Sequence, residues 1–245
     1  MKTEVLTIGI QKGGTGKTTT AAALAQAAVE DSKKVLCIDL DPQGNFSFAI
    51  GADRSGGNSY DLLTGTPAAE IIQTTPQRLE AIPASADLAT IQGGRGTARK
   101  LQNALEPIKK RFDVIIIDTP TAGGTLLYNA LQASTMLLIP LEADNSSLQG
   151  LYETLDTAHA IQQSNPALSF IGTAITKYDG RPNINKYLRE VIEQTAAEAG
   201  APCLATIRLG ISIKEAQNFQ QSVYDFAPRS RPAAEYMGLY KKLFS

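Results

Sequence analysis

The chain has 245 residues, of which 43% are hydrophobic and 19% are charged, a composition typical of a soluble globular protein. Its formal net charge is −1 and its isoelectric point is near 5.9, so no global positive field marks it as a nucleic-acid-binding protein. No apolar run approaches the roughly 20 residues that cross a bilayer, and no secretory signal is visible, so we expect a cytoplasmic protein.

The first half of the chain begins with a predicted strand at residues 5–10, a glycine-rich turn and an alanine-rich helix at residues 18–30. A second strand is predicted at residues 35–40. Residues 52–97 are less regular and contain prolines and the glycine-rich run 93–96. We expect short helices there and one short strand near residues 79–82, as an insertion on the same domain.

In the second half, the apolar run at residues 114–118 is typical of a strand buried on both faces. Further strands are predicted at residues 136–140, 170–176 and 203–207, and helices at residues 145–164, 183–199 and 233–244. Strands that alternate with helices predict an α/β fold, with a doubly wound, mostly parallel sheet flanked by helices, in a single domain over residues 1–245. Ligands bind such sheets at the carboxyl ends of the strands.

Residues 11–20 read Gln-Lys-Gly-Gly-Thr-Gly-Lys-Thr-Thr-Thr, between the first strand and the first helix. Nucleotide phosphates require backbone N–H donors, a lysine, a hydroxyl group for Mg²⁺ and a helix N-terminus, and this segment supplies all four. We therefore predict that the glycines let the backbone wrap the phosphates, that Lys17 reaches the β- and γ-phosphates and that Thr18 holds Mg²⁺. The predicted nucleotide contacts in this loop are Lys12, Gly13, Gly14, Thr15, Gly16, Lys17, Thr18 and Thr19.

Carboxylates follow two of the predicted strands. Asp118 ends the run at residues 114–118, where a carboxylate suits Mg²⁺ directly or through water. Asp39 and Asp41 lie two residues apart after the second strand. Two carboxylates beside a triphosphate are costly unless Mg²⁺ and lysines neutralise them.

The segment from Lys12 to Thr18 resembles the deviant Walker A motif of the ParA/MinD family of ATPases. The segment 39–45, Asp-Leu-Asp-Pro-Gln-Gly-Asn, is similar to the second motif of ParA and Soj proteins, and residues 115–120 resemble the family's Walker B strand. This resemblance implies ATP and Mg²⁺ as cofactors and a slow, partner-stimulated ATPase. It assigns Asp41 to the attacking water and Asp39 to the metal shell. It also implies that Lys12 reaches the partner's phosphates in a nucleotide-sandwich homodimer.

The same resemblance implies adenine contacts near Lys177, Arg208 and Pro228, and non-specific binding to double-stranded DNA. Residues 208–245 hold six basic and three acidic side chains, a local charge of +3. The candidate DNA contacts are Lys186, Arg189, Arg208, Lys214, Arg229 and Arg231. A family member of this kind partitions or positions a plasmid, chromosome or mobile element, associates with the bacterial nucleoid, and works with a ParB-like DNA-binding protein.

Three other classes remain open as alternatives. A membrane-cycling ATPase like MinD requires a C-terminal amphipathic helix, and residues 235–244 are short and follow Pro232. An electron carrier like the nitrogenase iron protein requires bridging cysteines, which Cys37 and Cys203 are not placed to supply. A metabolic synthetase of the same fold would not need Lys12. We therefore expect the partition-type ATPase, without a membrane partner.

Overall fold

The computed structural model describes residues 2–93 and 97–244, so part of the glycine-rich run 93–96 lies outside the described residues. Strand β1 (Glu4–Ile8) lies inside the sheet, with β5 (Val114–Asp118) on one side and β6 (Met136–Leu141) on the other. Beyond β5 come β2 (Val35–Asp39) and β4 (Glu80–Ile82), and beyond β6 come β7 (Phe170–Tyr178) and β8 (Cys203–Arg208). These strands are parallel to their neighbours, and β3 (Gln73–Thr74) is antiparallel to β4 at the edge. The predicted doubly wound, mostly parallel sheet is confirmed.

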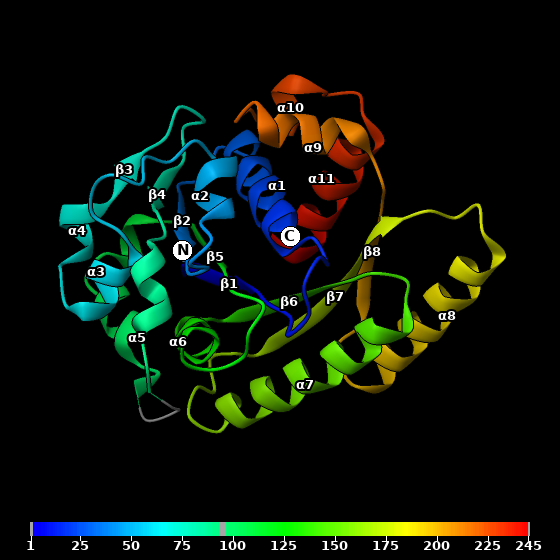
Figure 1. The fold of residues 1–245 in the computed structure, drawn as a ribbon, viewed down its shortest axis with the longest axis horizontal. Helices are drawn as coiled ribbons and strands as arrows, with labels where there is room; N and C mark the ends of the chain where they lie inside the picture. The colour runs from blue at the N-terminus through cyan, green and yellow to red at the C-terminus, as the bar shows by residue number, and fades with distance from the viewer. Residues whose placement is uncertain (1, 94–96, 245) are drawn as a thin grey trace.

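Helices cover both faces of this sheet (Figure 1). One face is covered by α1 (Lys17–Glu30), α2 (Asn45–Ala49) and α11 (Arg231–Phe244), whose apolar side chains share one buried cluster. The helices α9 (Ile211–Asn218) and α10 (Val223–Phe226) lie beside them. The opposite face carries α6 (Thr125–Ala133), α7 (Asn145–Gln162) and α8 (Asn183–Glu198).

The predicted insertion at residues 52–97 extends the sheet instead of forming a separate layer. It contains α3 (Ser59–Thr64), α4 (Ala68–Ile71), the 3₁₀ turn η1 (Ala86–Thr90) and the short strands β3 and β4. Together with α5 (Lys100–Leu105) and η3 (Lys109–Arg111), it covers the end of the sheet at β2 and β4. Among the described residues, no helix is both long and apolar enough to cross a bilayer.

Strand β5 explains how the site is fixed in place. Val114 and Ile116 pack toward α1, whereas Ile115 and Ile117 pack toward the opposite layer, and all four are buried. A shift of one residue would turn each of these side chains toward the other layer and disrupt the packing on both faces. Asp118, at the end of β5, is therefore held at a defined position beside the end of β1.

Helix α11 begins two residues earlier than the sequence predicts. Pro232 lies in its first turn, where the missing N–H of proline costs nothing because that position has no partner inside the helix. Five α11 side chains beyond Pro232 are buried against the domain, namely Ala233, Tyr236, Leu239, Tyr240 and Leu243. The C-terminal helix is thus an integral part of the core.

Candidate functional site

The loop between β1 and α1 lies at the switch point of the sheet, where the strands on the two sides of β1 are reached by opposite crossovers. Gly14 and Gly16 have φ angles of 80° and 81°, in the left-handed region that favours glycine. Gly16 is the N-cap of α1, and no side chain of the described residues accepts a hydrogen bond from the first N–H groups of this helix, which point toward the loop. This end of the helix suits an anion such as phosphate.

Lys17 reaches back over the same loop. Its side chain is buried, and its Nζ donates to the carbonyl oxygen of Lys12 over 3.1 Å and to Thr121 Oγ1 over 3.4 Å. Burial lowers the pKa of Lys17, while Asp118 and Asp41 act in the opposite direction. A buried ammonium group that is hydrogen-bonded only to neutral oxygens lacks a paired negative charge, so binding an anion would stabilise it.

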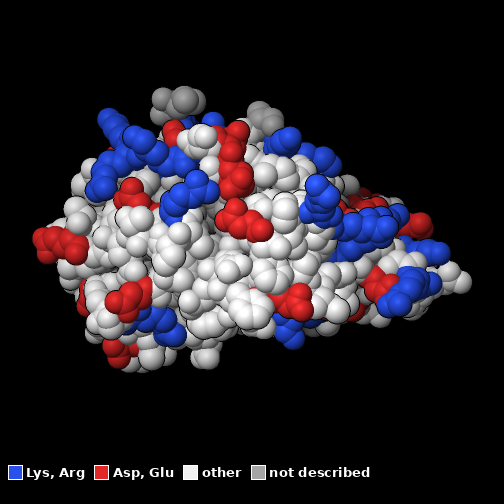
Figure 2. All heavy atoms as spheres, turned by 90° about the horizontal axis from the view of Figure 1, so that it is seen from above, with Lys and Arg blue, Asp and Glu red and all other residues white. Residues whose placement is uncertain are grey.

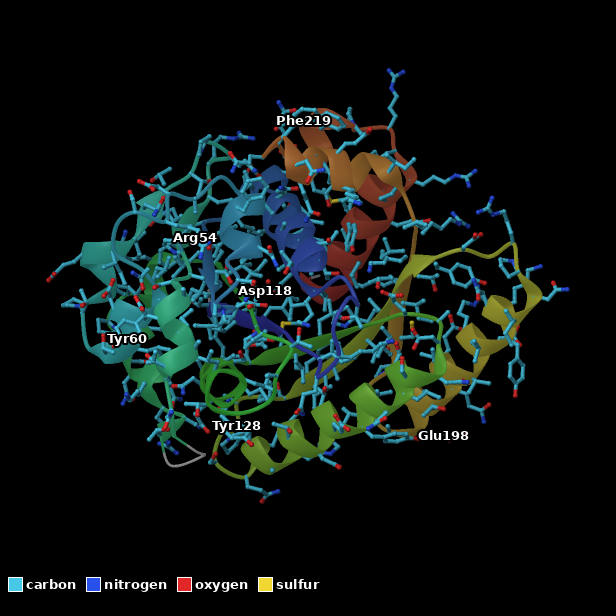
Figure 3. All side chains as sticks on the ribbon, viewed as in Figure 1. Arg54, Tyr60, Asp118, Tyr128, Glu198 and Phe219 are labelled. Atoms are coloured by element: carbon cyan, nitrogen blue, oxygen red, sulfur yellow. The ribbon has the colours of Figure 1, made fainter. Side chains whose placement is uncertain are left out.

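Thr18 and Asp118 meet at the ends of α1 and β5. Thr18 donates from its hydroxyl to Asp118 Oδ2 over 2.7 Å, and Asp118 Oδ1 is buried without a hydrogen-bond partner among the described residues. Burial first, and then Asp39, raise the pKa of Asp118 well above its usual range. Figure 3 labels Asp118 near the middle of the molecule.

This arrangement fits a magnesium ion shared with a nucleotide. The buried, unpartnered Asp118 oxygen lies beside a hydroxyl group, and both are ligands that Mg²⁺ accepts directly or through water. The described residues contain no cluster of three or more His, Cys, Asp or Glu side chains able to hold an ion by themselves. Mg²⁺ would therefore need phosphate oxygens to complete its coordination, as in other nucleotide sites.

Asp39 organises the loop that carries Asp41. One Asp39 oxygen accepts from the backbone N–H of Asp41 over 3.0 Å, and the other accepts from the N–H and hydroxyl of Ser47 over 2.8 and 2.7 Å. Burial raises the pKa of Asp39 to about 6, although the Ser47 bonds oppose it. Because both oxygens already have partners inside the protein, the structure gives Asp39 a supporting position, and its predicted metal contact stays a prediction.

Asp41 is only partly buried, at the end of the β2 loop. Its Oδ1 accepts from the N–H of Gln43 over 3.0 Å, which closes a tight turn. Asp41 lies close enough to Lys17 and Asp118 to influence the pKa of both. The structure thus brings together Lys17, Thr18, Asp41 and Asp118, and their separate roles remain predictions.

Lys12 does not point into its own phosphate loop. Its Nζ donates to both carboxylate oxygens of Asp144, over 2.6 and 2.7 Å, and to Ser147 Oγ over 3.0 Å. Asp144 is also the N-cap of α7, where it accepts from the N–H of Ser147. Gly150 lets α7 approach, because a Cβ there would lie 3.1 Å from Lys12 Cβ. Sequence reasoning missed this ion pair, which is formed within one chain.

A cavity of about 650 Å³ opens from the phosphate loop toward α2 and α9. Lys177 and Arg208, two predicted adenine contacts, line it, and the third, Pro228, is not among its lining residues. Lys177 is also bonded to the Gly14 carbonyl and to Glu142, 2.9 Å away. The cavity further includes Phe48 and Gln217, which sequence reasoning missed, and Gln217 accepts from the Thr19 hydroxyl over 3.2 Å.

The candidate DNA contacts lie on the outside of the molecule. Lys186, Lys214, Arg229 and Arg231 are exposed, whereas Arg208 forms an ion pair with Glu235 and the half-buried Arg189 lies over the Tyr178 ring. Figure 2 shows Lys and Arg side chains in two groups, one toward the narrow end of the molecule and one at its broad end. Arg208 and Arg231 also line a second hollow of about 390 Å³ with Arg181, a basic residue that sequence reasoning left out of the DNA set.

Comparison with known proteins places this site in a family. Residues 3–170 match the model of an AAA domain. The chain is 33% identical over 257 residues to the sporulation initiation inhibitor protein Soj of Bacillus subtilis, with 98% of each chain covered. It is 35% identical over 241 residues to the chromosome-partitioning ATPase Soj of Treponema pallidum, covering 95% of this chain and 94% of that protein.

The chain belongs to the ParA/Soj family of ATPases. The resemblance carried by the Walker motifs is therefore confirmed. A crystal structure of cobyrinic acid a,c-diamide synthase from Mycobacterium smegmatis with ADP and magnesium has a TM-score of 0.83 and 29% identity, and covers 98% of this chain and 94% of that one. This P-loop fold is thus shared by relatives with different activities.

Proposed function

We propose that this ParA-family ATPase is a slow, Mg²⁺-dependent switch that dimerises around ATP and then binds double-stranded DNA without sequence preference. Its task is to partition or position a DNA cargo on the nucleoid, and a ParB-like partner stimulates its hydrolysis. The observation that carries the proposal is the placement of its two lysines. Lys17 is buried over the phosphate loop, whereas Lys12 is held outside it by Asp144, so Lys12 is free to serve a second nucleotide once that pair opens.

Within one protomer, each residue has a separate task. The backbone of residues 13–16 and the N-terminus of α1 bind the phosphates, and Lys17 neutralises the β- and γ-phosphates. Thr18 and Asp118 hold Mg²⁺, which supplies charge neutralisation at the phosphate oxygens. Asp41 orients the attacking water. Because no strong general base stands beside it among the described residues, turnover should lie well below the roughly 1–100 s⁻¹ of kinases.

In the dimer, Lys12 leaves Asp144 and approaches the partner's phosphates, where it acts as a cation in trans comparable to an arginine finger. Pairing also doubles the number of basic side chains offered to DNA. A surface with modest affinity in one protomer then becomes bivalent, which raises its avidity. This explains why DNA binding should follow the nucleotide state.

The alternative of a MinD-like membrane cycle is disfavoured by α11. Its apolar face is buried on α1 and β8, so it is not available to enter a membrane surface without opening the core. Its two last-turn lysines, Lys241 and Lys242, do not change this, because Lys242 donates to the Leu204 carbonyl of β8.

Co-sedimentation decides between the two functions. The protein is mixed with random duplex DNA or with anionic vesicles, each with ATP and with ADP, and the Asp41→Ala variant is used to keep ATP intact. We expect ATP-dependent binding to DNA and none to vesicles. Binding to vesicles with ATP and none to DNA would overturn the proposal in favour of a membrane cycle.

A further inference from the structure

The loop that carries Asp41 is held on its inner side by Asp39 and on its outer side by a second group of contacts. Inside, Asp39 accepts from the Asp41 N–H and from Ser47. Outside, the chain turns through Gln43 and then Gly44, whose φ of 67° is in the left-handed region. A loop held only by its inner edge would leave the carboxylate of Asp41 free to shift relative to a bound phosphate.

Arg54 covers this outer side (Figure 3). Its Nη1 donates to the Gln43 carbonyl over 3.3 Å, and its Nε donates to the Ala84 carbonyl over 3.2 Å. A Cβ placed on Gly44 would lie 2.3 Å from Arg54 Cζ, so the guanidinium group rests directly against the glycine backbone. Glycine is required there both for its left-handed conformation and for this close contact.

The two carbonyl groups that Arg54 joins belong to one hydrogen-bonded circuit. Ala84 donates its N–H to Ser47 Oγ over 2.9 Å, and Ser47 in turn donates to Asp39. Arg54 therefore connects the outer side of the loop, at Gln43, to the segment after β4 that already supports its inner side. The planar, two-point geometry suits a guanidinium group and does not suit the ammonium of lysine.

We propose that Arg54 is a positioning residue for ATP hydrolysis, which holds the Asp41 loop so that its carboxylate meets the attacking water. The inference rests on the proposed role of Asp41. In the described part of the chain, Arg54 contacts residues 43, 44 and 84 and not the phosphate loop. Its loss should therefore leave ATP binding intact and slow the chemical step, because a shift of about 1 Å in a reacting group can cost on the order of 100-fold.

The test compares Arg54→Ala and Arg54→Lys with a control, Arg78→Ala, which removes another exposed arginine, paired with Glu30. We expect both Arg54 variants to lose roughly tenfold or more in kcat, with the Kd for ATP unchanged and the ATP-bound dimer retained. The control should hydrolyse ATP normally. Added guanidinium ion should restore part of the activity of Arg54→Ala, which a merely structural defect would not allow.

Asp41→Ala and the double variant separate this inference from the function on which it rests. If Asp41→Ala hydrolyses ATP normally, the proposed role of Asp41 is wrong. If Asp41→Ala is inactive but Arg54→Ala keeps its full rate, the Arg54 inference alone is overturned. Adding Arg54→Ala to Asp41→Ala should cause no further loss, because residues that act through one another are not additive.

Discussion

The Lys12–Asp144 pair offers a direct test of how dimerisation begins. Asp144→Asn removes the negative charge that holds Lys12 but keeps the N-cap of α7, because asparagine caps helices about as well as aspartate. The side chains of Lys12 and Asp144 are 19% and 42% exposed. Because solvent screens a partly exposed ion pair, we take its contribution to be about 1 kcal/mol per protomer. Two protomers must each break one pair, which gives about 2 kcal/mol, or roughly 30-fold, in the dimerisation constant.

Light scattering with ATP, in an Asp41→Ala background that prevents hydrolysis, measures this constant. Asp144→Asn should dimerise at a lower protein concentration than its parent, by about that factor. Glu80→Gln is the control, since it removes a carboxylate from an exposed pair with Arg111 at the far edge of the sheet. Weaker dimerisation of Asp144→Asn, or none, would refute the idea that Lys12 must leave Asp144 to reach the partner.

Four further outcomes are expected. Lys12→Ala should bind ATP almost normally by calorimetry, because Lys17 and the backbone donors remain, but it should neither dimerise nor hydrolyse ATP; a monomeric synthetase would tolerate the change. Asp41→Ala should accumulate as an ATP-bound dimer in light scattering, and a monomer at saturating ATP would contradict the sandwich. Burial raises the pKa of Asp118 well above its usual range and that of Asp39 to about 6; repulsion adds to this, from Asp39 and Asp41 at Asp118 and from Asp41 at Asp39. The Mg²⁺ proposed at Asp118 favours the ionised carboxylate. MgATP binding near pH 6 should therefore release protons and strengthen as the pH rises, which calorimetry in buffers of different ionisation enthalpy measures. The affinity of the ATP-bound form for DNA should fall steeply as the salt concentration rises. About three phosphate contacts per protomer give a slope near −5 in a plot of log K against log salt concentration. An affinity that does not change with salt would exclude recognition of the DNA phosphate backbone.

The phosphate loop could be predicted from the sequence because its residues are close together in the chain. The glycine spacing, Lys17 and Thr18 lie within one loop, and a motif of this kind fixes its own backbone conformation. Asp118 could be added because parallel strands end at the same edge of a sheet, so a carboxylate after β5 must lie near the end of β1. The prediction of the loop thus rests on motif spacing, and that of Asp118 rests on the topology of a parallel sheet.

The contacts that were missed join residues far apart in the chain. Lys12 and Asp144 are separated by 132 positions, and no residue pattern shows that α7 begins beside the phosphate loop. Nothing in the sequence around Arg54 distinguishes it from any other exposed arginine, and only the structure shows its contact with Gly44. Helix α6 was also missed: it has only nine residues, and so short an apolar segment gives a weak periodic signal.

The segment between β6 and α7 gives a physical reason for coupling nucleotide to pairing. Glu142 binds Lys177 and Asp144 binds Lys12, so one short segment neutralises two lysines beside the phosphate loop. A ligand can shift a conformational equilibrium only by its difference in affinity for the two states. In the proposed dimer ATP meets this condition, because one protomer offers ATP only Lys17 and the pair would also bring Lys12 to the γ-phosphate. On this proposal, the free energy by which ATP stabilises the dimer is the gain from the trans contact of Lys12 minus the cost of breaking its pair with Asp144. Loss of the γ-phosphate would remove the gain and leave the cost.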